Sequence, residues 1–223
     1  MDRTVVVTGA SRGIGRAIAE SFAEAGALVV ACARDADALA DLPEEIVTQR
    51  ADVRDEFDME RLMETAAREG GAIDVLVANA GVYHGEAGHT PITAESYAAW
   101  DDHVRTNGRG VFAAIKEAVP HLAADARVLV SSGRIAREAR PGFGSYAVSK
   151  ALAEATARQF AADLDIPVGV VDPGMVTTEL TDGMEGRAPE EVAGLFRWAA
   201  TEAPAEELDG GVLDLGAWKR ATR

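Results

Sequence analysis

The stretch "TVVVTGASRGIG", residues 4–15, decides the fold of this chain. A short apolar run leads into a turn with glycines at positions 9, 13 and 15, and a helical pattern begins there. A strand, a glycine turn and a helix N-terminus together form a phosphate cradle, because backbone N–H groups and the positive end of the helix dipole point outward. No Lys-Ser/Thr follows the last glycine, so the stretch is not a P-loop. It predicts a dinucleotide-binding site.

The rest of the chain alternates short apolar runs with longer amphipathic segments. Strands are predicted at 4–8, 27–33, 46–50, 73–78, 127–131, 167–171 and 212–215. Helices are predicted at 14–25, 36–41, 56–69, 94–118, 145–163 and 189–200, and loops at 132–144 and 173–188. Unbroken valine-rich runs are typical of strands covered on both faces. The pattern predicts an α/β, Rossmann-type, doubly wound and seven-stranded parallel sheet with helices on both faces, in a single domain over residues 1–223.

The composition limits the class of partner. The 223 residues carry a formal net charge of −15, and the excess of acids is spread along the chain. A surface of that sign repels nucleic acid and anionic lipid, so neither is expected as a partner. Basic residues are nearly all arginine, which suits either a cell rich in salt or a GC-rich genome with an acidic proteome.

The cysteine content and the N-terminus indicate a cytoplasmic location. There is 1 cysteine, Cys32, in an apolar run, which excludes a disulfide framework and predicts a buried strand residue. The first residues enter a strand at once, without the basic and apolar regions of a signal peptide. No apolar run is long enough to span a membrane.

The end of the second predicted strand bears on cofactor choice. An acid at that position binds the adenosine ribose, whereas an arginine attracts a 2′-phosphate. Here the chain reads Ala33-Arg34, and Arg12 in the glycine turn is within plausible reach. Two guanidinium groups near one phosphate favour NADP over NAD. Asp35 weakens this preference, unless its role is to cap the next helix.

The glycine turn also fits a second functional interpretation. "GASRG", residues 9–13, also matches G-x-S-x-G, the nucleophile elbow of serine hydrolases, with Ser11 as nucleophile. The elbow normally follows several strands, whereas here it follows the first. None of the histidines, His84, His89, His103 and His121, is in an obvious position for a general base.

Tyr146 and Lys150, in "GSYAVSK" (144–150), are the candidates for chemistry. Residues four apart share one face of a helix, and a nearby ammonium group stabilises a phenolate and lowers the tyrosine pKa from about 10. The pair could therefore act as a general acid/base on a carbonyl or alcohol oxygen. The alternative is a surface pair with no role.

Three predicted strands end in further polar or turn-forming residues. Ser131 and Ser132 end one strand, Asn79-Ala80-Gly81 ends another, and Pro173-Gly174 follows a third. Carboxyl ends of parallel strands meet at one edge of the sheet, where ligands bind in open α/β folds. Asn107 interrupts a long helix and could hold a water molecule or a backbone group.

These motifs, in this order, resemble those of the short-chain dehydrogenase/reductase family over essentially the whole chain. The matching pieces are "TGASRGIG" (8–15), "ADV" (51–53), "NAG" (79–81), Asn107, "SS" (131–132), "YAVSK" (146–150) and "PGMVTT" (173–178). The resemblance implies an oxidoreductase that transfers a hydride between NADP(H), or NAD(H), and a ketone or secondary alcohol. A non-catalytic NADP-binding regulator on the same fold is the alternative from another class.

The resemblance also assigns roles. Tyr146 is the general acid/base, Lys150 holds the nicotinamide ribose, Ser132 binds the substrate oxygen, and Asn107 holds a water molecule of a proton relay. Ser132 precedes Tyr146 by one residue more than is common, so Ser131 stays open as an alternative. The expected cofactor-binding residues are Thr8, Gly9, Ser11, Arg12, Gly13, Ile14, Gly15, Arg34, Asp52, Val53, Asn79, Ala80, Gly81, Tyr146, Lys150, Pro173, Gly174, Val176 and Thr178.

Other residues are given smaller roles. "DDH", residues 101–103, does not converge on one helix face, so no catalytic metal is expected. His84 and His89 are interpreted as exposed loop residues. The pocket could be shaped by Tyr83, Phe143, Met175 and Met184, and the substrate-covering segment 178–188 is short. Helices 94–118 and 145–163 are alanine-rich and, as commonly in the family, are expected to form the interface of a homodimer or homotetramer.

Overall fold

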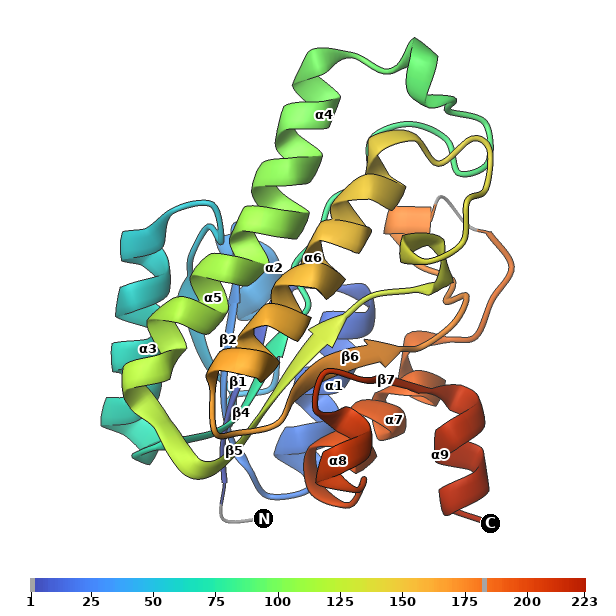
Figure 1. The fold of residues 1–223 in the computed structure, drawn as a ribbon. Helices are drawn as coiled ribbons and strands as arrows, with labels where there is room; N and C mark the ends of the chain where they lie inside the picture. The colour runs from blue at the N-terminus through green and yellow to red at the C-terminus, as the bar shows by residue number, and fades with distance from the viewer. Residues whose placement is uncertain (1–2, 182–183) are drawn as a thin grey trace.

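The computed structural model of this chain describes residues 3–181 and 184–223. Its centre is one sheet of 7 strands in the order β3-β2-β1-β4-β5-β6-β7, and all neighbouring strands are parallel (Figure 1). The order reverses between β1 and β4, as in a doubly wound sheet. The strands are β1 (Thr4–Thr8), β2 (Leu28–Ala33), β3 (Val47–Arg50), β4 (Ile73–Ala78), β5 (Leu122–Ser131), β6 (Val168–Asp172) and β7 (Val212–Asp214). The predicted α/β class is therefore confirmed.

Helices cover both faces of the sheet, so strands such as β1 and β6 are buried along their whole length. In the edge strands β3 and β7, less exposed and more exposed residues alternate. One core cluster joins the sheet to α1 (Gly13–Glu24) and α7 (Pro189–Thr201). The other joins it to α3 (Glu56–Gly70), α5 (Gly110–Ala118) and α6 (Gly144–Asp163). Cys32 is fully buried and its pKa is raised to about 12 by burial, as expected for a strand residue of the core.

The predicted helix 94–118 is present as an unbroken helical run that starts three residues later, at residue 97, and contains a π-helical segment that was not predicted. The segment holds α4 (Tyr97–His103), a π-helical segment (Val104–Arg109) and α5. Two glycines in it pack closely: a Cβ on Gly108 would lie 2.3 Å from Leu152, and one on Gly110 would lie 2.7 Å from Val53. These close approaches hold the widened turn against its neighbours.

The C-terminus contains a helix after the predicted final strand that the sequence analysis did not predict. After α8 (Ala205–Leu208) and β7, residues Leu215–Ala221 form α9. Asp214 begins α9, since its carboxylate accepts the N–H of Ala217 at 2.8 Å. The Trp218 ring packs against Gly194 of α7, where a Cβ would lie 2.8 Å from it. Asp35 likewise caps the short α2 (Ala36–Ala40). Among the described residues, no helix is long and apolar enough to cross a membrane.

Candidate active site

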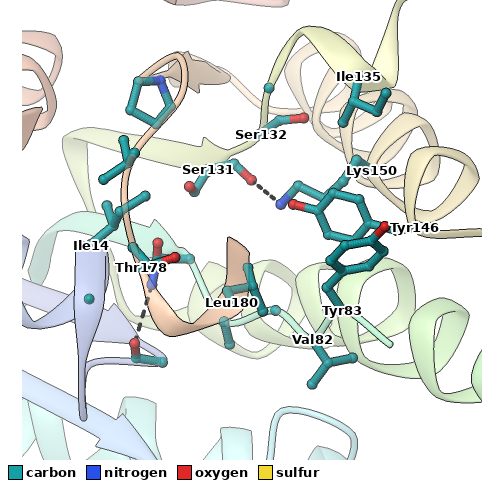
Figure 2. A pocket seen from close by; sticks show the side chains of 18 of the residues that line it. Ile14, Val82, Tyr83, Ser131, Ser132, Ile135, Tyr146, Lys150, Thr178 and Leu180 are labelled. Carbon is teal, nitrogen blue, oxygen red and sulfur yellow. Dashed lines mark hydrogen bonds between the residues drawn. The ribbon is translucent and has the colours of Figure 1, made fainter. Parts of the chain in front are cut away.

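A cavity of about 1520 Å³ opens at the carboxyl edge of the sheet, around the point where the strand order reverses. Its walls come from the β1–α1 turn, the ends of β2 and β4, the β5–α6 loop and the segment after β6. It is large enough for a dinucleotide and a small second ligand. Figure 2 shows the part around Tyr146 and Lys150.

Most of the predicted site residues line this one cavity. Those that do are Gly9, Ser11, Arg12, Gly13, Ile14, Arg34, Val53, Asn79, Ala80, Gly81, Ser131, Ser132, Tyr146, Lys150, Pro173, Gly174, Val176 and Thr178. Thr8, Gly15, Asp52 and Asn107 are not among the residues that line it. The residues considered as pocket-shaping, Tyr83, Phe143, Met175 and Met184, also line it. Residues 182 and 183 of the predicted covering segment 178–188 lie outside the described residues.

The glycine turn is held open by close packing. Gly9 has a φ of 70°, which favours glycine, and a Cβ on Gly15 would lie 2.1 Å from the Gly9 carbonyl oxygen. Thr8 Oγ1 accepts the N–H groups of Asn79 and Ala80, each at 3.1 Å, and Asn79 Nδ2 donates to the Thr8 carbonyl at 3.1 Å. Thr8 and Asn79 therefore join the ends of β1 and β4 behind the turn.

The two arginines expected at the adenosine end differ in their contacts. Arg34 is exposed and lines the cavity directly after β2. Arg12 is ion-paired with Glu179 from the segment after β6, and both side chains are exposed. Asp52 is turned toward Arg54, to which its carboxylate is hydrogen-bonded at 2.6 Å. Asp52 does not line the cavity, whereas its neighbour Val53 does.

Lys150 lies one turn beyond Tyr146 on α6, as predicted, and is buried. Its ammonium donates to the carbonyl oxygen of Ser131 at 2.6 Å (Figure 2). The Ser132 hydroxyl lies in the cavity wall and is buried, and among residues 3–181 and 184–223 it has no hydrogen-bond partner. A buried polar group without a partner is costly, so this hydroxyl is a candidate to meet a ligand atom.

The pKa of Tyr146 does not follow the expectation. Burial, and the neighbouring Tyr83, raise it to about 12. The Tyr83 and Tyr146 rings lie 4.6 Å apart and form one wall of the cavity with Val82 and Ile135 (Figure 2). The Lys150 ammonium is directed to the Ser131 carbonyl, and burial lowers its own pKa to about 8.

Asn107 occupies the π-helical turn and acts on backbone groups. Its Oδ1 accepts the N–H of Val82 at 2.8 Å, and its Nδ2 donates to the Val82 carbonyl at 2.9 Å. The same Nδ2 donates to Ser149 Oγ at 2.9 Å, and Ser149 Oγ donates to the Tyr146 carbonyl at 2.8 Å. Asn107 therefore ties the wall after β4 to the helix that carries Tyr146.

A buried histidine was missed by the sequence analysis. His103, from the "DDH" run, is fully buried, and its Nε2 accepts the N–H of His84 at 2.9 Å. Its Nδ1 therefore carries the hydrogen and faces Ser145 Oγ at 2.7 Å. Glu95 accepts the N–H of Ser145 at 2.6 Å. Only the tertiary fold brings these groups to the start of α6, so spacing along the chain carried no signal for them.

The rival chemistries gain no support from the geometry. Within the described part of the chain, none of the four histidines is hydrogen-bonded to Ser11; His84 instead contacts Asp102, with His84 Nε2 2.8 Å from Asp102 Oδ2. Among the same residues, no group of three or more His, Cys, Asp or Glu side chains is placed to hold a metal ion.

Comparisons with known proteins agree with this geometry. Residues 3–187 match the family described as "short chain dehydrogenase". The cis-4-hydroxycyclohexanecarboxylate dehydrogenase of Sinomonas cyclohexanicum is 34% identical over 95% of this chain and 94% of that protein. The chloroplastic NADPH-dependent aldehyde reductase 2 of Arabidopsis thaliana is 32% identical over 97% and 89%. A glycine betaine reductase of Emericella nidulans is 35% identical, but this chain spans only 15% of it.

The solved structures include an alcohol dehydrogenase of the archaeon Thermococcus sibiricus in complex with 5-hydroxy-NADP. It superimposes with a TM-score of 0.84 at 26% identity, over 96% of this chain and 95% of that one.

Proposed function

Since the chain belongs to the short-chain dehydrogenase/reductase family, we propose that it transfers a hydride between NADP(H) and a ketone or secondary alcohol, with Tyr146 as general acid/base. One observation carries the proposal: the Tyr146 ring, the buried Lys150 ammonium and the unpartnered Ser132 hydroxyl line the same cavity as the glycine turn. A general acid, a second oxygen-binding group and a phosphate cradle are the parts that a carbonyl reductase needs.

The residues present fit a dinucleotide. Gly9 and Gly13 both line the cavity with no side chain, and a Cβ on Gly13 would lie 3.3 Å from Thr178 and narrow the space between the glycine turn and the segment after β6. When bound, the cofactor supplies the hydride. Backbone groups of the glycine turn would hold the pyrophosphate, and Val176 and Thr178 would hold the nicotinamide end.

The chain's own residues would handle one proton and one oxygen. The pKa of Tyr146, about 12, keeps its hydroxyl protonated at neutral pH, as an acid for carbonyl reduction requires. The Ser132 hydroxyl would hydrogen-bond the same substrate oxygen and stabilise the charge that develops on it. Lys150 would hold the nicotinamide ribose. Its positive charge next to Tyr146 would also favour the phenolate in the oxidative direction.

The shape of the cavity suits a substrate with an apolar body. Beside Tyr146 the wall is formed by Val82, Tyr83, Ile135 and Leu180 (Figure 2). A ketone with an aliphatic or aromatic substituent next to the reacting carbon would bury that substituent there.

The cofactor preference is tested by Arg34→Asp. The exchange removes a guanidinium from the adenosine end and adds a charge that repels a 2′-phosphate, so the Kd for NADPH is expected to rise about 10- to 100-fold and that for NADH to change little or to fall. Nicotinamide fluorescence measures both in one titration. Arg158→Asp, which changes an exposed arginine of α6, is the control. Tighter binding of NADH than of NADPH by the unaltered protein would favour the NAD alternative, and binding of neither would contradict the proposal.

The assembly is proposed to be a homodimer or homotetramer through α4, α5 and α6. Apolar side chains are exposed on these helices, among them Tyr97, Phe112, Val148 and Leu152. A patch of this kind marks an interaction surface. Sedimentation of the intact chain is expected to give a dimer or larger species that Leu152→Glu dissociates. A monomer at micromolar concentration would contradict this proposal but would not affect the proposed hydride-transfer reaction.

A further inference from the structure

Four charged side chains meet at the wall of the cavity, and three of them, Arg137, Lys150 and Asp172, line it. Arg137, from the loop between β5 and α6, is ion-paired through Nη1 with Glu154 and through Nη2 with Asp172. Glu154 and Asp172 are almost fully buried, with 2% and 4% of their side chains exposed. Lys150 is the fourth member, since it precedes Glu154 by one helical turn and both carboxylates act on its charge.

The geometry gives each carboxylate a second link to the site. Glu154 lies two turns beyond Tyr146 on α6. Asp172 is the last residue of β6 and lines the cavity, and its Oδ1 accepts the N–H of Gly174 at 2.9 Å, just before Val176, which is proposed to hold the nicotinamide end. Arg137 therefore joins three elements: the substrate-side loop, α6 and the end of β6.

Removing Arg137 would leave a charge imbalance. Two carboxylates buried away from water would then face one ammonium group. Lys150 donates to an uncharged carbonyl, that of Ser131, so a guanidinium is the group that balances the second negative charge. The Tyr146 ring lies beside Lys150 (Figure 2), and the Tyr83 ring lies 4.6 Å from the Tyr146 ring.

We propose that Arg137 is a positioning residue of the active site: it neutralises Glu154 and Asp172 so that Lys150 is not held by two carboxylates, and it anchors the loop after Ser132. The catalytic meaning of this role rests on the proposed function, whereas the electrostatic link does not. Burial lowers the pKa of Lys150 to about 8 and the two carboxylates act to raise it, which agrees with such a balance.

The charge balance predicts opposite effects for two substitutions. Arg137→Gln removes one positive charge and is expected to raise the pKa of Lys150 by about one unit or more. Asp172→Asn removes one negative charge, keeps an oxygen for the Gly174 N–H, and is expected to lower it. The double variant restores the balance and is expected to return the pKa to within about half a unit of the original.

Lysine NMR measures this without turnover. The chain has only three lysines, Lys116, Lys150 and Lys219, so ¹³Cε-labelled lysine gives three signals, and Lys150→Met assigns the one of interest. The full chain is titrated between pH 6 and 11 in each variant. Arg158→Gln, an exposed arginine on the same helix, is the control that should shift nothing. If Arg137→Gln fails to fold, Asp172→Asn and the double variant still test the balance.

The pH dependence of carbonyl reduction provides the second measurement. In the pH profile of carbonyl reduction, the apparent pKa assigned to Lys150 is expected to be higher in Arg137→Gln and lower in Asp172→Asn. In the double variant it is expected to return to near the original value. A purely structural role would lower activity in both single variants with no return. An unchanged Lys150 titration in folded Arg137→Gln would overturn the inference. Shifts by NMR with no turnover of any carbonyl compound would instead refute the proposed function and leave the electrostatic link standing.

Discussion

Tyr146→Phe is expected to lower kcat for ketone reduction by about 10²- to 10⁴-fold while leaving the Kd for NADPH within about threefold. The substitution removes the hydroxyl that would give its proton to the substrate oxygen and keeps the ring that packs against Tyr83 at 4.6 Å. The loss should therefore fall on the chemical step and not on folding or cofactor binding. Steady-state kinetics and a fluorescence titration of NADPH on the same preparation separate the two.

Two matched variants sharpen this test. Tyr97→Phe removes a hydroxyl from a side chain that is 90% exposed on α4 and should leave kcat unchanged. Tyr83→Phe removes the hydroxyl that faces the Gly142 carbonyl at 3.5 Å, beside the same pocket. If Tyr83→Phe were inactive and Tyr146→Phe active, the acid would have been assigned to the wrong ring of the pair. Full activity in both would remove the general-acid mechanism altogether.

The fold was predictable from the sequence because local and global signals agree. Strands buried on both faces show as valine runs, and the glycine turn after Thr8 marks the first crossover. The details that the sequence did not show depend on tertiary packing. The apolar pattern of 94–118 continues through the π-helical turn, whose position depends on close contacts of Gly108 and Gly110 with α6 and the loop after β3.

The candidate site was predictable as far as strand ends determine it. Residues that follow β1, β4, β5 and β6 reach the same sheet edge whatever their side chains do, so the motif positions converge on one cavity. Side-chain direction does not follow from this. Arg12 pairs with Glu179 and Lys150 donates to the carbonyl of Ser131, and both partners are distant in the chain. Asp52 turns to its near neighbour Arg54, which is also ion-paired with the distant Asp102.

Lys150→Met is expected to abolish turnover and yet raise the stability of the cofactor-free protein. In the folded state burial lowers the pKa of Lys150 from 10.5 to about 8, so keeping its charge at pH 7 costs about 3 kcal/mol. Methionine fits the same space without a charge, but the Ser131 carbonyl loses its 2.6 Å hydrogen bond, which offsets about 1–2 kcal/mol. The net gain in the free energy of unfolding is about 1–2 kcal/mol, measured by urea denaturation at pH 7.

The pH dependence identifies the cause of that gain. Because the folded pKa lies below the unfolded one, the unfolded state binds more protons between about pH 8 and 10.5, so the unaltered protein gains stability as pH rises through that window. Lys150→Met lacks this contribution, and its advantage should be largest below pH 8 and disappear near pH 10.5. Lys116→Met, at a side chain that is 60% exposed, should change stability by less than about 0.5 kcal/mol at any pH. If Lys150→Met destabilised the protein at pH 7, the attraction between the Lys150 charge and the carboxylates of Glu154 and Asp172 would outweigh the cost of burying that charge. The Lys150 charge would then stabilise the folded protein.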